Sequence, residues 1–512
     1  MLVKTYGSTI HGIDAIAITV EVNIDQGVNF FMVGLPDNAV KESHQRIESA
    51  LRNIGYHIPG KKIVINLAPA DIRKEGSSYD LTIAIGILAA SGQIPHEEVG
   101  KYIILGELSL DGSLQPVKGA LPIAIEARKA GYKGFILPMA NAREAAIVSE
   151  LNVYGMHNMK EVIDFFRGET KPAPVVVNTR DEFYAHLNEY EFDFADVKGQ
   201  ENIKRALEIA AAGGHNVILI GPPGAGKTML AKRLPSILPP LNLHEALETT
   251  KIHSVAGKMN RESSLIAMRP FRSPHHTISD VALVGGGGNP QPGEISLAHN
   301  GVLFLDELPE FKRTVLEVLR QPMEERTVTI SRAKFSVEYP ASFMLVAAMN
   351  PCPCGYYNHP EKDCVCGPGI VQKYLNKISG PLLDRIDIHV EVVPVPFREL
   401  SSTRVMEKSE SIRARVVKAR QLQEERFKES KGIYCNAQMS SKQLRSICKV
   451  TDAGQVLLKT AMEKLSLSAR AYDRILKVAR TIADLDTSPD ILNEHLAEAI
   501  QFRSLDRETW GG

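Results

Sequence analysis

A glycine-rich segment at residues 221–228, GPPGAGKT, carries the clearest chemistry in this sequence. It fits the pattern G-x-x-x-x-G-K-[ST] at every fixed position, and an apolar run, VILI at residues 217–220, precedes it. Such a loop turns backbone N–H groups toward phosphate oxygens at the start of a helix, where negative charge is favoured. Lys227 would reach the β- and γ-phosphates, and Thr228 would bind Mg²⁺. The residues expected around the phosphates are Gly221, Pro222, Pro223, Gly224, Ala225, Gly226, Lys227 and Thr228.

Three polar residues follow apolar runs that are typical of buried strands. In VLFLDE, residues 302–307, Asp306 would hold Mg²⁺ through water, and Glu307 would orient and deprotonate an attacking water. In VAAMN, residues 346–350, Asn350 can contact the γ-phosphate or that water. Acidic residues and asparagines end many strands, so each motif alone is weak evidence. Their order after the phosphate-binding loop predicts a nucleotide hydrolase.

Two arginine segments lie farther along the chain. A motor that hydrolyses nucleotide between subunits needs a cation supplied in trans to the transition state. Arg385 follows a Gly-Pro turn in GPLLDRID, and SARAYDR contains Arg470 and Arg474. The spacing of these residues does not choose between them.

Four of the six cysteines form two C-x-C pairs separated by nine residues, with His359 between the pairs. Four thiolates can give a tetrahedral zinc site, although zinc knuckles more often use C-x-x-C. The alternative is a set of reduced thiols in a loop rich in Pro and Gly. Cys435 and Cys448 are isolated and are interpreted as ordinary thiols. The predicted zinc ligands are Cys352, Cys354, Cys364 and Cys366.

Composition limits the class of protein. The chain has 512 residues, too many for one domain of roughly 100–200 residues. Its 60 basic and 60 acidic residues balance, so any nucleic-acid surface must be local. The N-terminus lacks an apolar signal-peptide core, and the longest apolar stretch, residues 81–90, is about half of a membrane span. We therefore expect a cytoplasmic protein with no membrane partner, and the few cysteines do not suggest a disulfide scaffold.

Three regions and a linker differ in pattern. Residues 1–168 mix alternating apolar runs with helical stretches, and residues 169–190 have the Pro and polar content of a linker. Residues 191–396 alternate helices with short buried strands, which is typical of a parallel α/β sheet. Residues 397–512 are predicted to be helical. We expect an α/β protein with a mixed first domain and a helical C-terminal domain.

The order of these motifs, up to SARAYDRILKVARTIADL, resembles the magnesium-chelatase branch of AAA+ ATPases. The stretch FRSPHHTISDVALVGGGGNPQPGEISLAHNGVLFLDELPEF resembles more closely the ComM/YifB family of Mg-chelatase-like bacterial proteins, and the resemblance covers nearly the whole chain. It implies ATP and Mg²⁺ as cofactors and a homo-oligomeric ring, a hexamer. It also implies that Arg385 is the arginine finger, that Arg470 is the lid arginine called sensor 2, and that Val197 and Gly199 border the adenine.

The same resemblance implies a DNA substrate, single-stranded or branched, remodelled by branch migration. Residues 326–339, RTVTISRAKFSVEY, alternate like a hairpin with Arg332 and Lys334 near its centre. In related helicases a hairpin before the asparagine strand enters the pore of the ring. Two cations per subunit would line that pore for phosphates. The Gly-rich stretch 285–293 is a candidate second loop, and an ordinary solvated hairpin is the alternative.

Two segments of the first region, KEGSSYDL and GELSLDGSLQPVKGAL, resemble the Lon-type protease domain, whose fold is ribosomal protein S5 domain 2-like. Ser78 falls where the nucleophile would lie, and in Lon a lysine is its base. The matching stretch, Leu121-Pro-Ile123, lacks a lysine, and Lys118 is out of register. We expect a Lon-like α+β fold without peptidase activity that serves assembly or DNA contact.

The leading hypothesis is a ring-forming ATPase motor that translocates on or remodels DNA. One alternative is a chelatase motor subunit acting on a protein partner that holds a porphyrin. The other is an ATP-dependent Lon-type protease, whose cleavage would disappear in Ser78→Ala. A DNA motor should show DNA-stimulated ATPase activity that added salt weakens, whereas a chelatase subunit should not.

Overall fold

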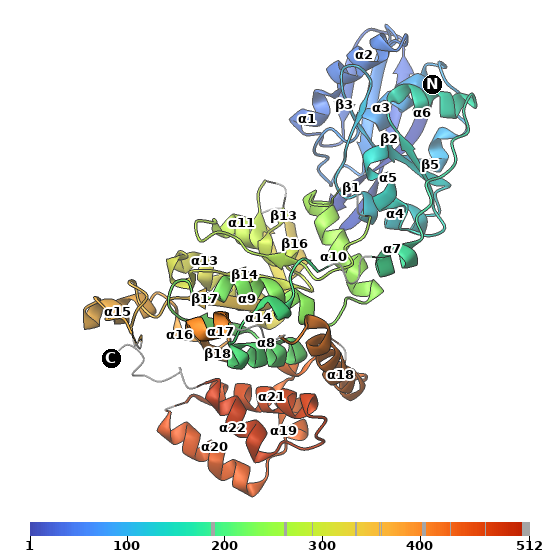
Figure 1. The fold of residues 1–512 in the computed structure, drawn as a ribbon. Coiled ribbons are helices and arrows are strands. Elements are labelled where there is room, and N and C mark those ends of the chain that lie inside the picture. The colour runs from blue at the N-terminus through green and yellow to red at the C-terminus, as the bar shows by residue number, and fades with distance from the viewer. Residues whose placement is uncertain are drawn as a thin grey trace.

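The computed structural model follows the chain through three successive parts (Figure 1). An N-terminal part and a central part each contain a large sheet, and helices make up the C-terminal part. In the part of the chain that the structure describes, no helix is long and apolar enough to cross a membrane. The described residues are 1–185, 190–260, 264–288, 290–332, 335–357, 359, 361–401, 406–430, 432–465 and 467–503.

The N-terminal sheet has seven strands in the order β3-β4-β2-β1-β5-β8-β9, with both antiparallel and parallel pairs. Helix α3 is buried along its whole length against β1 and β2, which explains the apolar stretch at residues 81–90 as a core helix. The mixed sheet confirms the predicted α+β fold of this part. The strands are β1 (Leu2–His11), β2 (Asp14–Asp25), β3 (Phe30–Val33), β4 (Lys62–Ala68), β5 (Tyr102–Ile104), β8 (Gly134–Pro138) and β9 (Asn152–Met156). The helices are α1 (Asn38–Lys41), α2 (Ser43–Asn53), α3 (Asp80–Ala90), α4 (Ala120–Lys129), α5 (Met139–Ala145), α6 (Met159–Arg167) and α7 (Thr179–Ala185).

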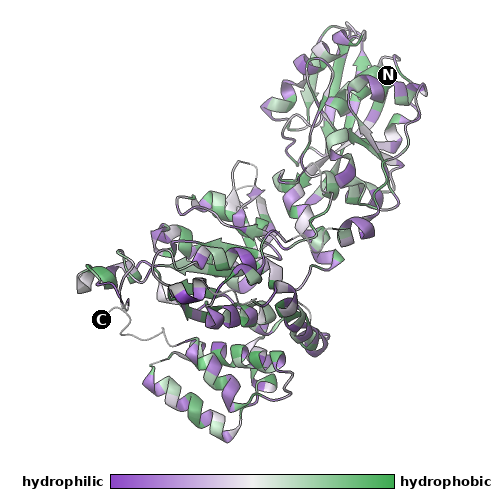
Figure 2. Ribbon diagram, viewed as in Figure 1, coloured by the Kyte–Doolittle hydropathy of each residue, from purple (hydrophilic) through white to green (hydrophobic). Residues whose placement is uncertain are grey.

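The central sheet is parallel, with the strand order β11-β14-β17-β10-β18. Its inner strands are buried at every position, which is why they are continuous apolar runs in the sequence. Figure 2 shows the hydrophobic residues gathered in the strands of both large sheets. In a parallel sheet the carboxyl ends of the strands lie at one edge, where ligands usually bind. The strands are β10 (Val217–Ile220), β11 (Phe271–Arg272), β14 (Val302–Leu305), β17 (Met344–Met349) and β18 (Ile388–Glu391).

Helices surround this sheet and form the C-terminal part. Helix α21 packs its apolar face on α8 and α18, so the C-terminal helices rest directly on the central part. The central helices are α8 (Glu201–Gly213), α9 (Lys227–Arg233), α10 (Leu243–Ala256), α11 (Asp280–Val284), α12 (Glu294–Leu297), α13 (Arg313–Glu317), α14 (Arg320–Glu325), α15 (Pro368–Leu375), α16 (Gly380–Leu383) and α17 (Phe397–Leu400). The C-terminal helices are α18 (Ser409–Phe427), α19 (Ser441–Ile447), α20 (Asp452–Lys464), α21 (Ala469–Leu485) and α22 (Asn493–Gln501).

Helix α10 joins the central part to the N-terminal part. It packs against α4, and Leu241 and Ala246 belong to the apolar core of the N-terminal part. The buried Glu144 carboxylate accepts hydrogen bonds from the Leu121 N–H, at 3.0 Å, and from the Ser254 hydroxyl of α10. Burial raises the pKa of Glu144. These buried contacts attach the two parts to each other.

A buried ion pair fastens α21 to the central sheet. Asp387, at the start of β18, lies 2.9 Å from Arg474 and 3.3 Å from the His215 imidazole. Burial alone would raise the pKa of Asp387, but Arg474 and His215 lower it well below its ordinary value. A lowered pKa means that this carboxylate stabilises the fold above its unfolded-state pKa, and the contribution is lost as the pH falls.

We expect Asp387→Asn to lower the free energy of unfolding by about 3–5 kcal/mol at neutral pH, because the largely buried Arg474 and the fully buried His215 would both lose their charged partner. Urea denaturation measures the change. Asp384→Asn is the matched control: its partner Arg470 is 3.5 Å away and 65% exposed, so that exposed pair should contribute about 0–1 kcal/mol. Equal losses in the two variants would contradict this assignment.

Candidate nucleotide-binding site

The phosphate-binding loop connects β10 to α9. Gly224 and Gly226 have φ of 78° and 86°, a left-handed conformation that favours glycine. The Lys227 ammonium donates to the carbonyls of Gly221, at 2.7 Å, and Pro222, at 2.9 Å. Burial lowers the pKa of Lys227, and the nearby carboxylates oppose that shift. The loop therefore surrounds a cation at the start of a helix, an arrangement suited to phosphate.

The strand-end residues meet the loop at the carboxyl edge of the central sheet. The Thr228 hydroxyl donates to the Asp306 carboxylate at 2.6 Å, so the two predicted Mg²⁺ ligands adjoin. The Lys227 ammonium donates to the side-chain oxygen of Asn350 at 3.1 Å. Glu307 follows Asp306 with φ of 53° and an exposed carboxylate. Oxygen ligands at this spacing fit Mg²⁺, which prefers carboxylates, hydroxyls and phosphate oxygens.

A histidine that the sequence did not single out contacts Glu307. The Nδ1 atom of His276 lies 3.3 Å from the Glu307 carboxylate, and its ring packs on His275 with centroids 4.1 Å apart. His276 follows β11, which is a neighbour of β14, so its segment leaves the same edge of the sheet. The available signal was the pair of adjacent histidines itself. The imidazole fixes the side chain that is the candidate base.

The predicted arginines lie apart from the phosphate-binding loop. Arg385 pairs with Glu324 at 2.5 Å and donates to the Pro381 carbonyl at 2.6 Å. Arg470 is largely exposed beside Asp384. Neither forms a hydrogen bond or ion pair with the loop among the described residues. Arg474 pairs with the buried Asp387 carboxylate, which gives this arginine a structural role.

The segment expected to border the adenine lies against the phosphate-binding loop. Val197 is fully buried, and Gly199 has φ of 62°. The adjacent Gln200 side chain donates to the carbonyls of Ala225, at 2.9 Å, and Val393, at 3.2 Å. These bonds connect the segment to the loop and to the chain after β18.

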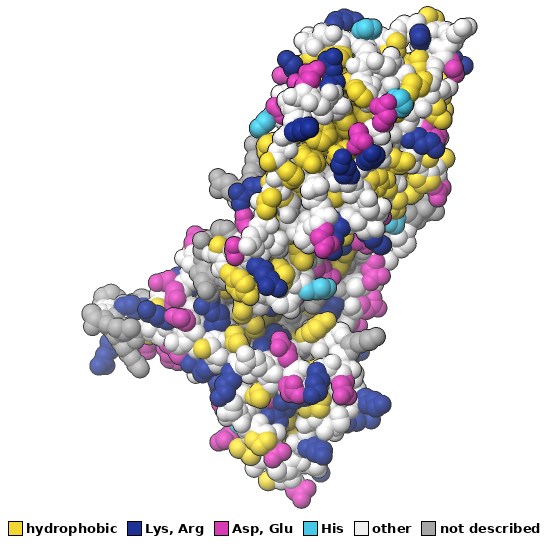
Figure 3. Space-filling model, turned by 90° about the vertical axis from the view of Figure 1, so that its right-hand side faces the viewer, with side chains coloured by type: hydrophobic (Ala, Val, Ile, Leu, Met, Phe, Trp, Pro, Cys, Tyr) yellow, Lys and Arg dark blue, Asp and Glu magenta, His cyan; other side chains and the backbone are white. Residues whose placement is uncertain are grey.

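The expected hairpin forms as β15 (Thr327–Arg332) and β16 (Phe335–Pro340), with Arg332 opposite Phe335. Lys334 lies outside the described residues, and the structure describes only the backbone of Arg332. The Tyr339 hydroxyl donates to the Pro290 carbonyl at 2.8 Å, so the hairpin packs on the Gly-rich stretch. Figure 3 shows basic and acidic side chains interspersed over one face of the molecule, in keeping with a zero net charge.

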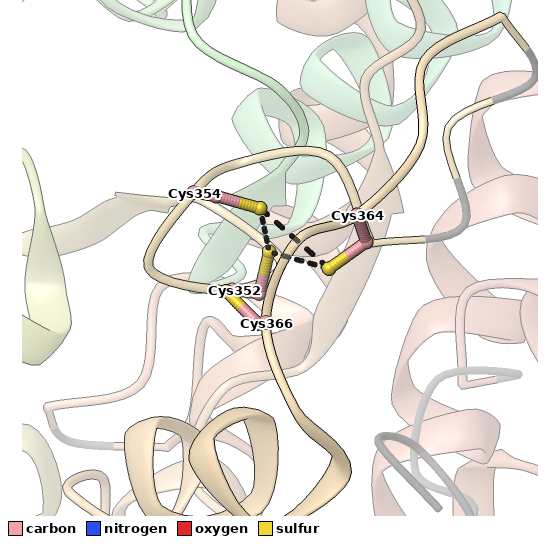
Figure 4. Close-up of side chains that lie close together, drawn as sticks. All are labelled: Cys352, Cys354, Cys364 and Cys366. Carbon is pink, nitrogen blue, oxygen red and sulfur yellow. Dashed lines mark hydrogen bonds between the residues drawn. The ribbon is translucent and has the colours of Figure 1, made fainter.

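The two C-x-C pairs converge (Figure 4). All four sulfur atoms lie within 4.8 Å of one another, and the Cys352 sulfur is 3.3 Å from that of Cys354 and 3.7 Å from that of Cys364. His359 instead accepts the backbone N–H groups of Glu361 and Lys362. The cluster therefore offers four sulfur ligands without the histidine.

The Lon-like segment lacks a nucleophile paired with a base. Within the described ranges, the Ser78 hydroxyl has no hydrogen-bond partner. Leu121 and Ile123 of α4 are buried and apolar. The Lys118 side chain lies against Gly257, at the contact with the central part. No catalytic pair is assembled around Ser78 in this part of the structure.

A phosphate-binding loop before a helix, a strand-end Asp-Glu pair and a strand-end Asn on one parallel sheet define a P-loop ATPase of the AAA+ class. A family model for magnesium chelatase, subunit ChlI, matches residues 193–400. Models for subunit ChlI of Mg-chelatase and for the C-terminal part of ChlI match residues 20–141 and 406–503.

Relatives that match over nearly the full length of the chain identify the family within the AAA+ class. The chain is 44% identical over 509 residues to competence protein ComM of Haemophilus influenzae, covering 99% of this chain and 98% of that protein. It is 46% identical over 501 residues to the uncharacterized protein YifB of Escherichia coli, covering 97% and 96%. Lon protease 2 of Bacillus subtilis is 30% identical over 185 residues, 31% of this chain and 33% of that protein. The chain belongs to the ComM/YifB family of Mg-chelatase-like AAA+ ATPases.

Proposed function

We propose that this chain assembles into a hexameric ring whose ATP hydrolysis drives translocation on, or branch migration of, single-stranded or branched DNA. The observation that carries the proposal is the position of the β15–β16 hairpin. It directly precedes β17, whose end bears Asn350, so one short connection joins the candidate DNA contact to the nucleotide site. The full-length relative named as a competence protein supports the assignment.

In this proposal each site residue has one role. Lys227 binds the β- and γ-phosphates, and Thr228 and Asp306 hold Mg²⁺. Glu307 takes a proton from the attacking water, and Asn350 contacts the γ-phosphate or that water. Residues from other segments complete the site: Val197 and Gly199 at the adenine, Arg470 from the lid, and Arg385 from a neighbouring copy of the chain.

In this proposal each region of the chain has a separate role. Residues 1–168 form a Lon-like domain for assembly or DNA contact, and residues 169–190 link it to the motor. Residues 191–396 form the ATPase core, and residues 397–512 form the lid. A cytoplasmic location belongs to this proposal, since none of the six cysteines, all of which the structure describes, forms a disulfide.

The hairpin cations give the first test. We expect the double variant Arg332→Ala, Lys334→Ala to keep its basal ATPase rate and to lose stimulation by DNA, because those charges contact the phosphates. In the unmodified protein, added salt should weaken the stimulation, because phosphate contacts release counterions. The measurement is ATPase rate with and without single-stranded, duplex and forked DNA.

A matched control removes two cations elsewhere. Lys459 and Lys464 are exposed on α20 of the lid, and the variant Lys459→Ala, Lys464→Ala should keep its stimulation by DNA. Stimulation that survives loss of the hairpin cations would mean that DNA binds elsewhere.

We also propose that the four-cysteine cluster holds zinc. A tetrahedral site with Zn–S bonds of about 2.3 Å places its sulfurs about 3.8 Å apart. The sulfur separations of 3.3, 3.6 and 3.7 Å among Cys352, Cys354 and Cys364 are close to that spacing. Bound zinc would tie the two C-x-C pairs together.

We expect about one zinc per chain in protein purified without chelators, because four thiolates complete the coordination of a single tetrahedral ion. The variant Cys364→Ser, Cys366→Ser should contain none, because two of its four ligands are gone. Elemental analysis of both proteins makes the measurement. A zinc-free unmodified protein, prepared under reducing conditions, would contradict the site.

The match to ChlI models favours one second candidate, a chelatase-type motor subunit that acts on a protein partner. It predicts normal basal ATPase activity that no DNA stimulates at any salt concentration. A Lon-type protease is disfavoured, since no base adjoins the Ser78 hydroxyl in the described part of the chain. Casein cleavage that disappears in Ser78→Ala would instead support the protease function.

A further inference from the structure

We propose that the cysteine knuckle, defined as the described residues between Cys352 and Cys366, positions Asn350 and one side of the phosphate-binding loop, so that metal in the knuckle sets the rate of ATP hydrolysis. The inference rests on the zinc assignment above and not on DNA as the substrate. Three independent contacts connect the knuckle to the nucleotide site.

The first contact is the chain itself. Only Pro351 separates Asn350 from the first sulfur ligand, and the proline ring fixes the backbone torsion between them. Cys352 is completely buried in the apolar core beside β17, in the same cluster as Met349. The position of the Cys352 sulfur therefore constrains Asn350, whose side-chain oxygen accepts a hydrogen bond from the Lys227 ammonium.

The second contact joins the knuckle to the phosphate-binding loop. Gly355, with φ of 84°, lies so close to Pro223 that an added Cβ would be 2.5 Å from the proline Cδ. The Gly355 N–H donates to the Cys352 carbonyl at 3.0 Å, which closes a tight turn around the first C-x-C pair. The backbone of the knuckle thus packs directly on the loop that surrounds the phosphates.

The third contact is made by helix α15, which follows the second C-x-C pair of the knuckle. Helix α15 begins two residues after Cys366, and its Tyr374 is buried in the apolar cluster that also contains Cys352 and Met349, the residue before Asn350. Burial there raises the pKa of Tyr374. Asn350 is therefore constrained from both ends of the knuckle.

Metal would hold these two ends together. The pairs Cys352–Cys354 and Cys364–Cys366 belong to opposite ends of the knuckle, and sulfur contacts of 3.6 and 3.7 Å connect them. Binding a metal there stabilises the folded arrangement of the ligands. Strand β17 is paired with β10 and β14 independently of the knuckle, so the sheet should persist without metal.

The experiment compares intact protein, metal-stripped protein and Cys364→Ser, Cys366→Ser. Cys435→Ser, which changes a thiol outside the knuckle, is the control. We expect both metal-free forms to bind ADP and to keep a cooperative unfolding transition, while basal kcat falls about 10²-fold, as for loss of one preorganised polar contact. Cobalt chloride added to stripped protein should give the thiolate-to-cobalt absorption band and restore the rate.

A double-mutant cycle separates positioning from general damage. In an Asn350→Ala background the two cysteine substitutions should lower kcat by a clearly smaller factor than in the unmodified protein, because part of their effect acts through Asn350. Additive losses, an unchanged rate without metal, or a joint loss of ADP binding and of the unfolding transition would each overturn the inference. Failure of DNA to stimulate ATPase activity would leave it intact, since every readout is made without DNA.

Discussion

Arg385→Ala should lower kcat for ATP by about 10³–10⁵-fold while ATP binding and ring assembly persist. Arg385 is bound to Glu324 and the Pro381 carbonyl, away from the phosphate-binding loop of its own chain. In a ring this segment can face the site of the next subunit, where a guanidinium would stabilise charge in the transition state. Steady-state ATPase rates, nucleotide binding and particle mass measure the three properties.

Mixed rings test whether the arginine acts in trans. Arg385→Ala subunits keep a complete phosphate-binding loop, whereas Lys227→Ala subunits keep a complete finger. Mixing the two inactive proteins should therefore restore part of the activity, because one kind of interface pairs an intact loop with an intact finger. Glu324→Gln, which releases the arginine from its partner, should remain active. Mixed rings that form but stay inactive would contradict the assignment.

Glu307→Gln should bind ATP and hold it unhydrolysed, with kcat lowered by about 10²–10⁴-fold. The amide keeps the shape of the side chain but cannot take a proton from water. Asp306 and Thr228, which adjoin at 2.6 Å, would still hold Mg²⁺, so nucleotide affinity should be retained. Radiolabelled nucleotide recovered from the protein after rapid gel filtration should be ATP and not ADP.

Glu310→Gln is the matched control for that variant. This carboxylate lies three residues along the chain and pairs with Lys377 at 3.3 Å. Its substitution should leave turnover near the unmodified rate. Rapid turnover in Glu307→Gln would assign the base to another residue.

Local patterns predicted the parts of the site that lie at strand ends. The phosphate-binding loop, Asp306 and Asn350 each follow an apolar run, and the geometry of a parallel sheet places such ends together. His276 and Tyr374 could not be found this way. His276 belongs to a connection and Tyr374 to the short helix α15, and the positions of both depend on packing against segments distant in sequence.

The same limit applies to the arrangement of whole elements. Helix α10 follows the phosphate-binding loop in sequence, yet Ala246 packs in the core of the N-terminal part. Arg470 and Arg474 lie one turn apart on α21 with similar surroundings in sequence, but only the second reaches the buried Asp387. Sequence spacing shows that two residues share a helix face and cannot show which of them meets a buried partner.

The most direct test of the account is strand movement on a three-strand branched DNA, followed by fluorescence with ATP and Mg²⁺ present. The account predicts that the unmodified protein moves the branch and releases a labelled strand, and that Lys227→Ala, which cannot use ATP, does neither. Normal ATP turnover without movement of any branched or single-stranded substrate would contradict the account and favour a motor that acts on a protein partner.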